Sequence, residues 1–253
     1  MDNVTVIKRK DASRPVMRQT VINGAEYLAF PAIEETGVVR HLMSTRLGGV
    51  SEGDLWSMNV SFSRGDKTEN VNENYRRIAA ALGCTPEDFV FSDQTHTTNI
   101  RHVTEADKGK GLLRPRDYTD VDGMITDEPG IVLSTFYADC VPLLFVDPIK
   151  RAVGLSHSGW KGTAGGMGRK TVEAMEKAFG SRPEDILVGI GPSICQDCYE
   201  VSEDVAEAFR NLLSGEKMKK VKTITEEQIL KDKRNGKYQL DLWKANEALS
   251  LIH

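Results

Sequence analysis

The sequence predicts a single α+β domain in which mixed β-sheets are flanked by helices. Short β-type runs and amphipathic helical segments alternate irregularly along the 253 residues, without a repeated β-α-β unit. The chain shows no internal repeat, and no segment has the composition of a linker. We therefore expect one domain over residues 21–253, preceded by a polar and charged lead-in over residues 1–20 that is mobile.

The first third of the chain predicts two strands, a glycine-rich loop and a helix. Residues 27–30 and 38–44 have strand-like composition and are separated by a turn containing glycine. Gly48 and Gly49 permit positive φ in the loop over residues 44–51. Thr68 is the expected N-cap of a helix whose apolar residues recur every three or four positions, and Gly83 is expected to end it.

The sequence after Gly83 predicts further strands and three more helices. The β-type runs are residues 89–103, 131–137, 141–146, 151–155 and 186–190. One helix should follow Gly165-Gly166 and end at Gly180, a second should run from Ser202 to residue 213, and a third should begin at Asp241 and run to residue 251. The charge-rich residues 216–237 are expected to form an exposed excursion.

Composition argues against several classes of protein. A net charge of -4 and a pI near 5.8 give no general attraction to nucleic acid or to an anionic membrane. No apolar run approaches the ~20 residues that span a bilayer, and the N-terminus lacks the apolar segment of a signal peptide. We expect a cytoplasmic protein that binds neither nucleic acid nor membrane and is a monomer or a weak homodimer.

The four cysteines are expected to be thiols or metal ligands rather than disulfides, as is usual in the cytosol. Cys195 and Cys198 form a Cys-Gln-Asp-Cys pair, but a zinc ribbon needs a second pair. The pair also follows Gly191-Pro192-Ser193 in a loop, whereas a thioredoxin-like motif lies where a strand leads into a helix. A structural loop is the favoured interpretation.

Two histidines and one cysteine have unusual surroundings. His96 lies in Gln-Thr-His-Thr, Cys140 ends Tyr-Ala-Asp-Cys before the apolar residues 141–146, and His157 opens His-Ser-Gly-Trp-Lys-Gly-Thr after residues 152–155. Two imidazoles and one thiolate leave a tetrahedral zinc ion with one open position, which indicates a catalytic rather than a structural site. His102 would share a strand face with His96 but lie ~20 Å away at full extension, so it is not expected to join the site.

Eight short motifs occur in order between residues 44 and 201. They are Ser44-Thr45-Arg46 with Gly48-Gly49-Val50-Ser51, Asn72-Glu73-Asn74, Gln94-Thr95-His96, Asp122-Gly123, Ala138-Asp139-Cys140-Val141-Pro142, His157-Ser158-Gly159-Trp160-Lys161-Gly162, Gly191-Pro192-Ser193-Ile194 and Cys198-Tyr199-Glu200-Val201. With this set the chain resembles the laccase-domain family, also called the purine nucleoside phosphorylase or multicopper polyphenol oxidoreductase family.

The resemblance implies a zinc ion held by His96, Cys140 and His157. It implies phosphorolysis of adenosine, inosine, guanosine and methylthioadenosine, and deamination of adenosine, with a purine nucleoside and phosphate as the small-molecule partners. It also implies a cysteine-hydrolase-like fold, as in a deamidating bacterial toxin domain. The sequence departs from the family pattern at Lys161, where arginine is usual, and it ends at His253 without the family's further C-terminal segment.

Both reactions would need residues beyond the metal ligands. A zinc ion with three protein ligands lowers the pKa of its water to about seven, which would permit attack on C6 of adenine. Asp139, beside Cys140, is the candidate for moving the proton. Phosphorolysis needs cations and amide donors around phosphate, and the candidates are Arg46, Arg64 and Lys161, each beside or close to a glycine.

Two other classes of enzyme remain open. Two histidines and a cysteine also suit copper, and the family has been associated with polyphenol oxidation, although a multicopper centre needs more than the five histidines present. Alternatively, Cys140 could be the nucleophile and His157 the base of a cysteine hydrolase, including one active in peptidoglycan editing. Zinc separates the alternatives, because it would inhibit the hydrolase and is required by the zinc enzyme.

Overall fold

The computed structural model describes residues 16–215 and 224–250 and forms two compact units, with the boundary in the chain between Thr85 and Pro86. The expectation of one domain over residues 21–253 stays a prediction. Residues 1–15 of the expected lead-in lie outside the described residues, and the first strand already begins at Arg18. Both units combine helices with β-sheet, so the predicted α+β class is confirmed.

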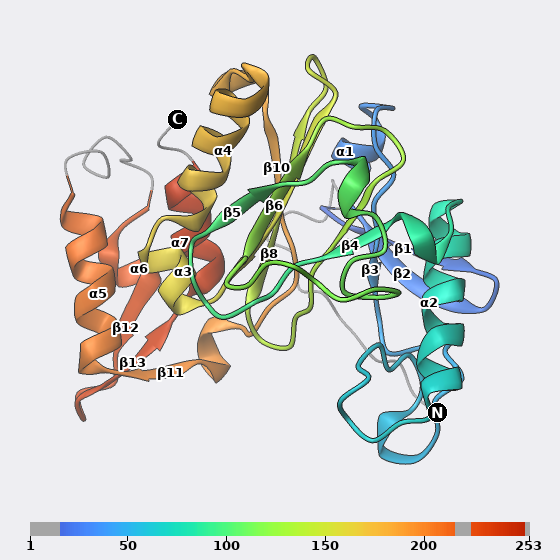
Figure 1. Ribbon diagram of the computed structural model, residues 1–253. Helices are drawn as coiled ribbons and strands as arrows, with labels where there is room; N and C mark the ends of the chain where they lie inside the picture. Colours follow the sequence, from blue (N-terminus) through green and yellow to red (C-terminus); the bar gives the residue numbers. More distant parts are fainter. Residues whose placement is uncertain (1–15, 216–223, 251–253) are drawn as a thin grey trace. The chain divides into compact units, whose positions relative to one another are not determined.

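The first unit contains a three-stranded antiparallel sheet, two α-helices and a 3-10 helix (Figure 1). Its elements are β1 (Arg18–Ile22), β2 (Ala25–Ala29), α1 (Pro31–Glu34), β3 (Met43–Ser44), the 3-10 helix η1 (Gly53–Leu55) and α2 (Thr68–Leu82). Asn23 and Gly24 join β1 to β2 with φ of 52° and 81°, the backbone that a tight hairpin turn requires. Gly83, at φ 71°, ends α2 as expected.

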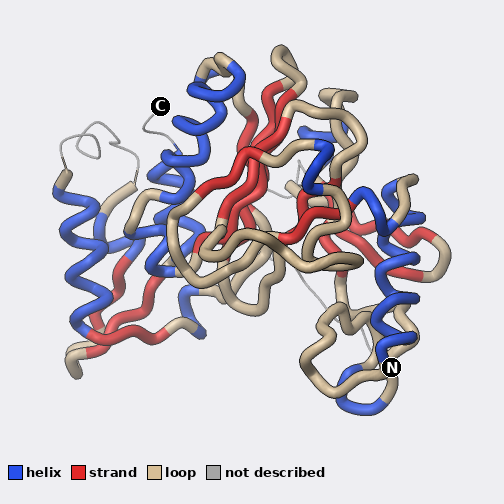
Figure 2. Tube along the Cα trace, in the orientation of Figure 1, coloured by secondary structure: helices blue, strands red, loops and turns tan. Residues whose placement is uncertain are grey.

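The second unit is built around a five-stranded sheet in the order β10-β8-β9-β6-β5. Figure 2 draws the strands in red. β5 and β6 are parallel and the other pairs antiparallel, so the sheet is mixed, as predicted. The strands are β5 (Ile100–His102), β6 (Gly123–Thr126), β8 (Val141–Asp147), β9 (Ala152–Ser158) and β10 (Leu187–Ile190).

Two smaller sheets complete the second unit. β4 (Phe89–Phe91) pairs in parallel with β7 (Val132–Ser134). β11 (Glu200–Ser202), β13 (Lys237–Leu240) and β12 (Leu230–Asp232) form an antiparallel sheet in that order. The helices are α3 (Trp160–Ala164), α4 (Met167–Phe179), α5 (Glu203–Ser214), α6 (Glu226–Ile229) and α7 (Leu242–Ser250), with 3-10 helices η2 (Pro86–Asp88), η3 (Glu105–Asp107), η4 (Pro183–Asp185) and η5 (Gln196–Cys198).

The core of the second unit lies between the large sheet and its helices. All seven residues of β8 are buried, and α4 packs against β9, β6 and β5. Leu143 and Phe145 of β8 join Met175 of α4 and Phe209 of α5 in one apolar cluster. Full burial of each such side chain stabilises the fold by about 1.5–3 kcal/mol. This core fixes the ends of β8 and β9.

The single strand expected over residues 89–103 is wrong, because the chain leaves β4 after Phe91 and resumes as β5 only at Ile100. The expected excursion over residues 216–237 is also wrong in part: residues 216–223 lie outside the described residues, but α6 and β12 follow them. The final helix begins as predicted, since the Asp241 carboxylate accepts the Lys244 N–H at 2.8 Å. None of the helices within residues 16–215 and 224–250 has the length and apolar composition to cross a membrane.

Candidate metal centre

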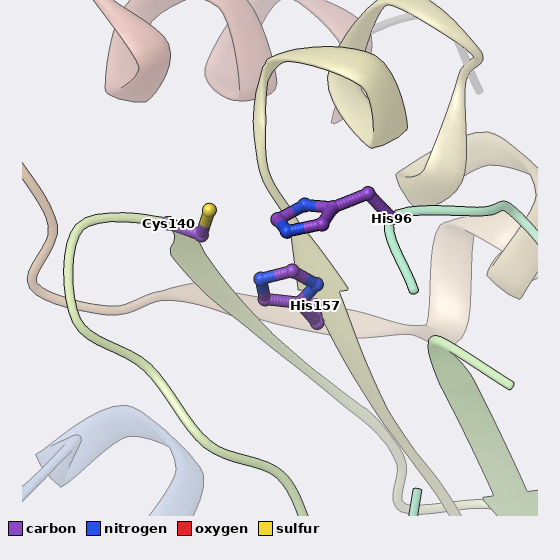
Figure 3. Close-up of side chains that lie close together, drawn as sticks. All are labelled: His96, Cys140 and His157. Carbon is purple, nitrogen blue, oxygen red and sulfur yellow. The ribbon is translucent and has the colours of Figure 1, made fainter. Parts of the chain in front are cut away.

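Three segments of the second unit bring His96, Cys140 and His157 together. One ligand atom of each lies within 4.8 Å of those of the other two. His96 comes from the loop between β4 and β5, Cys140 directly precedes β8, and His157 lies near the end of β9. Figure 3 shows the two rings and the sulfur turned toward a common space. The convergence that the sequence predicted is therefore present in the described residues.

The pairing of β8 with β9 places the cysteine beside one histidine. The strands are antiparallel, with Pro142 opposite His157 and Val141 opposite Ser158. Continuing this register places Cys140 opposite Gly159. The beginning of one strand therefore lies beside the end of the other, and both side chains reach the same edge of the sheet.

His96 depends on an unusual backbone conformation. Its φ of 64° lies in the left-handed region, which costs a residue with a side chain about 1–3 kcal/mol. The Asp122 carboxylate offsets this cost, because it accepts the backbone N–H groups of Thr95, His96 and Thr97 at 3.0, 3.2 and 2.8 Å. The loop closes around this carboxylate and turns the His96 ring toward His157, with ring centroids 4.9 Å apart.

Asp122 also holds the second histidine. Its Oδ1 lies 2.8 Å from Nδ1 of His157, and its carbonyl accepts the His157 backbone N–H at 2.8 Å. With Nδ1 bonded to the carboxylate, Nε2 of His157 is left to face the site. Carboxylates commonly orient metal-binding histidines in this way. Asp122 is fully buried, and the Thr97 hydroxyl donates a further hydrogen bond to it.

The protonation states of His157 and Cys140 suit metal binding, but they do not favour a Cys140 thiolate without a metal. Burial lowers the pKa of His157, against the opposing effect of Asp122, so the ring is neutral at neutral pH. Burial, then the negative charges of Asp139 and Asp122, raise the pKa of the Cys140 thiol. A cation bound between the three side chains would reverse this effect, because metal ligation deprotonates a thiol. The donor set therefore fits a divalent ion with an open fourth position.

Gly159 leaves room for this cluster. A Cβ at this position would lie 2.7 Å from Cys140 Sγ, closer than atoms in contact allow, and 3.2 Å from His96 Nδ1, which is an unusually tight contact. Its φ of -71° and ψ of -177° are open to any residue, so backbone conformation does not require glycine here. Glycine is needed here because the side chains of Cys140 and His96 occupy the space that a Cβ would take.

Sequence reasoning missed the roles of Asp122 and Gly159. Both stand in motifs that carry the family resemblance, which was the available signal, but neither has a distinctive residue type. Tyr137 was missed as well: it is half-buried beside His157, with ring centroids 5.8 Å apart, and its hydroxyl donates to the Ser156 carbonyl at 3.2 Å. Burial raises the pKa of Tyr137, so the phenol stays protonated.

The other predicted site residues occupy exposed positions. Asp139 is exposed and directly precedes Cys140. Lys161 is exposed in α3, two residues after Gly159, with Nζ 5.6 Å from the centre of the Trp160 ring. In the first unit, Arg64 is exposed before Gly65, and Arg46 donates through Nε and Nη2 to the Trp56 carbonyl at 3.1 and 2.7 Å. His102 stays outside the cluster, as expected, and lies 3.8 Å from Asp127.

Comparisons with known proteins agree with the motifs. A family model described as multi-copper polyphenol oxidoreductase laccase matches residues 40–251. The purine nucleoside phosphorylase of Deinococcus radiodurans is 39% identical over 211 residues, which are 83% of this chain and 74% of that protein. A further relative, adenosine deaminase RL5 of an unknown prokaryotic organism, is 32% identical over 81% of this chain and 76% of its own length.

Solved structures show the same fold. The crystal structure of YlmD from Geobacillus stearothermophilus aligns with a TM-score of 0.80 at 34% identity, covering 93% of this chain and 83% of that one. The family model, which matches residues 40–251, includes every segment that supplies a residue of the metal cluster. The chain belongs to the multi-copper polyphenol oxidoreductase laccase family.

Proposed function

We propose that this protein is a zinc-dependent enzyme acting on purine nucleosides, by phosphorolysis of adenosine, inosine, guanosine or methylthioadenosine and by deamination of adenosine. The observation that carries the proposal is the convergence of His96, Cys140 and His157 within 4.8 Å. The names of the relatives, purine nucleoside phosphorylase and adenosine deaminase, supply the substrate class and the reactions. The proposal includes a cytoplasmic monomer or weak homodimer.

The chain's own residues have separable tasks in this proposal. The two imidazoles and the thiolate would hold a zinc ion, which would supply Lewis acidity. Asp122 orients His157 and shapes the His96 loop. Asp139 is exposed beside Cys140, where a carboxylate can take up or release a proton. Lys161, Arg46 and Arg64 are the proposed cationic groups for phosphate or the nucleoside.

A second candidate function is a cysteine hydrolase of the toxin-like fold, including one active in peptidoglycan editing. The observation that favours it is the order Cys140, His157 and Asp122, in which the carboxylate lies 2.8 Å from the histidine, as in a nucleophile–base–acid triad. The raised pKa of Cys140 counts against it, because the thiolate is the nucleophile. Copper in place of zinc is the third possibility. The described residues form one three-ligand cluster, whereas a multicopper centre needs several.

The purine assignment predicts turnover of adenosine by the metal-replete protein. With phosphate the products should include adenine and ribose 1-phosphate, and without phosphate they should include inosine. Chromatography with mass detection identifies each product. Absence of all three products, with metal content confirmed, would exclude the purine assignment, and activity abolished by zinc would favour the cysteine hydrolase.

The ligand assignment predicts about one equivalent of zinc per chain, at ~2.0–2.3 Å from each ligand atom. Alanine at His96, Cys140 or His157 should each lower the bound zinc far below one equivalent, because a two-ligand site remains. Elemental analysis after dialysis measures this content. His102→Ala is the matched control, since this exposed histidine of the same unit lies outside the cluster. Full zinc content in a ligand variant would remove that residue from the site, and more copper than zinc would reassign the metal.

The anion-binding role predicts that Arg46→Ala keeps its zinc while kcat/KM falls about 10- to 150-fold, the equivalent of one charge-assisted hydrogen bond. The loss should grow at low phosphate. Arg46→Lys should recover only part of the activity, because lysine lacks the planar fork. Arg76→Ala, which changes an exposed arginine of α2 in the same unit, should leave the kinetics unchanged. Unaltered kinetics in both Arg46 variants would show that the guanidinium only holds the Trp56 carbonyl.

A further inference from the structure

Cys195 and Cys198 lie at the two ends of one tight turn. The Cys198 N–H donates to the Cys195 carbonyl at 3.1 Å, and the Tyr199 N–H donates to the same carbonyl at 3.1 Å. A turn of this kind brings the first and fourth Cα atoms to within about 7 Å. Disulfides span Cα separations of about 4.4–6.8 Å, so the backbone already has the spacing that a bond between these residues requires.

The two thiols can also be reached from solvent. A hydrogen bond that the Cys198 thiol donates to Cys195, followed by the negative charge of Cys195, raises the pKa of Cys198. Cys198 is exposed and Cys195 is partly exposed. By contrast, Cys140 belongs to the metal cluster and Cys84 lies in the other unit.

The segment that carries this pair runs beside the Cys140 segment. The Ile194 N–H donates to the Asp139 carbonyl at 3.0 Å, and the Gly191 N–H donates to the Pro142 carbonyl at 2.8 Å. Tyr199, adjacent to Cys198, has its pKa raised by burial and then by the negative charges of Cys140 and Asp139. The segment that leads into the turn over residues 195–198 is therefore hydrogen-bonded to the chain on both sides of Cys140, at Asp139 and at Pro142.

We infer that Cys195 and Cys198 form a reversible dithiol–disulfide pair that is oxidised by low-molecular-weight disulfides and acts on the neighbouring metal centre. This revises the structural role that the sequence suggested for the pair. It is a modification site rather than a thioredoxin-type active site. The strand β11 follows the turn, whereas a thioredoxin motif opens a helix whose N-terminus lowers the thiol pKa.

The reaction with oxidised glutathione balances without another reagent. One cysteine, as its thiolate, attacks a glutathione sulfur, breaks the glutathione disulfide and releases one glutathione thiolate. The second cysteine loses its proton to solvent, attacks the protein sulfur of the mixed disulfide and releases the second glutathione. Two electrons pass from the protein to the oxidant, and the products are one protein disulfide and two molecules of reduced glutathione.

The test uses the full-length, metal-replete protein in glutathione buffers of increasing oxidised fraction. After acid quenching and alkylation, peptide mass spectrometry should show Cys84 and Cys140 as alkylated thiols and a disulfide between Cys195 and Cys198. Dithiothreitol should reduce this disulfide. Cys198→Ser should instead trap a glutathione adduct on Cys195. Cys84→Ser, the matched control, should form the disulfide as the wild type does. Alkylation of both cysteines throughout the series, or a disulfide that includes Cys140 or Cys84, would overturn the inference.

A second measurement tests the action on the metal centre. Zinc release to a chromogenic chelator should differ at least threefold in rate between the reduced and the oxidised wild type, and it should be insensitive to glutathione in Cys195→Ser. Equal release rates from the two wild-type forms would overturn this part. The metal readout rests on the proposed zinc site, whereas the thiol readout does not, so the failure of one is distinguishable from the failure of the other.

Discussion

Asp122→Asn should weaken zinc binding by about 10- to 100-fold, the usual effect of removing a carboxylate that orients a metal-binding histidine. The Asp122 carboxylate accepts hydrogen bonds from both histidine-bearing segments: the His157 ring on one side, and the amides of residues 95–97 on the other. An asparagine side chain keeps one acceptor oxygen but directs an NH₂ group at donors. The His96 loop then loses the interactions that stabilise its positive φ.

Asp122→Ala should be more damaging, because it leaves three backbone N–H groups without the carboxylate that accepts them. These hydrogen bonds are part-buried, and a hydrogen bond to a charged group contributes about 1.5–3 kcal/mol, so the free energy of unfolding should fall by several kcal/mol. Chelator competition measures the zinc affinity, and urea denaturation of the metal-free protein measures stability. The two readouts separate a positioning role from a purely structural one.

Asp127→Asn is the matched control for both Asp122 variants. The strand β6 lies between Asp122 and Asp127, but the Asp127 side chain is 47% exposed and lies 3.8 Å from the His102 ring. Its replacement should leave zinc affinity unchanged and stability within about 0.5 kcal/mol. Unchanged zinc affinity in folded Asp122→Asn would show that the carboxylate does not position the ligands.

Local sequence patterns predicted the elements that are fixed by local interactions. The helices α2 and α4 have apolar residues at helical spacing and end at Gly83 and Gly180, both with positive φ. The strand β8 was also predicted from its local sequence. A strand that is buried on both faces is apolar throughout and shows no alternation of polar and apolar residues. For these elements, the residues that determine the structure lie within a few positions of one another.

The parts that sequence reasoning missed depend on residues that are distant in the chain. The Asp122 carboxylate meets the amides of residues 95–97 and the ring of His157, which lie 25 to 35 positions away. That contact interrupts the strand expected through residue 96. Likewise, Gly159 is explained by the Cys140 sulfur across the β8–β9 pair. The three candidate ligands were predicted from their residue types together with the family resemblance, whereas aspartate and glycine are common in turns.

Gly159→Ala should disrupt the metal centre although it adds a single methyl group. That carbon would lie 2.7 Å from Cys140 Sγ and 3.2 Å from His96 Nδ1, so both side chains must move. Overpacking of this kind costs about 1–3 kcal/mol, and displaced ligands should weaken zinc binding by about 5- to 150-fold. Isothermal titration with zinc, and the alkylation rate of Cys140 in the metal-free protein, measure the two consequences.

Gly168→Ala is the matched control for this variant. Gly168 is buried in α4 of the same unit, but its added Cβ would meet Leu143 at 3.6 Å, an ordinary contact. Zinc binding should be unchanged, and stability should rise by about 0.5–1 kcal/mol, because alanine favours the helix. A parallel loss of zinc affinity in both alanine variants would mean that the metal centre responds to general changes in packing.

The double variant Gly159→Ala/Cys140→Ala identifies the atom responsible. If the clash with the Cys140 sulfur dominates, Gly159→Ala should destabilise the metal-free Cys140→Ala protein by at least 0.5–1 kcal/mol less than it destabilises the metal-free wild type, roughly the coupling seen between contacting residues. Equal destabilisation in the two backgrounds would assign the effect to His96 or to the backbone. Because φ at Gly159 is open to any residue, a backbone cost should be small, and the coupling reports the space that the cysteine sulfur needs.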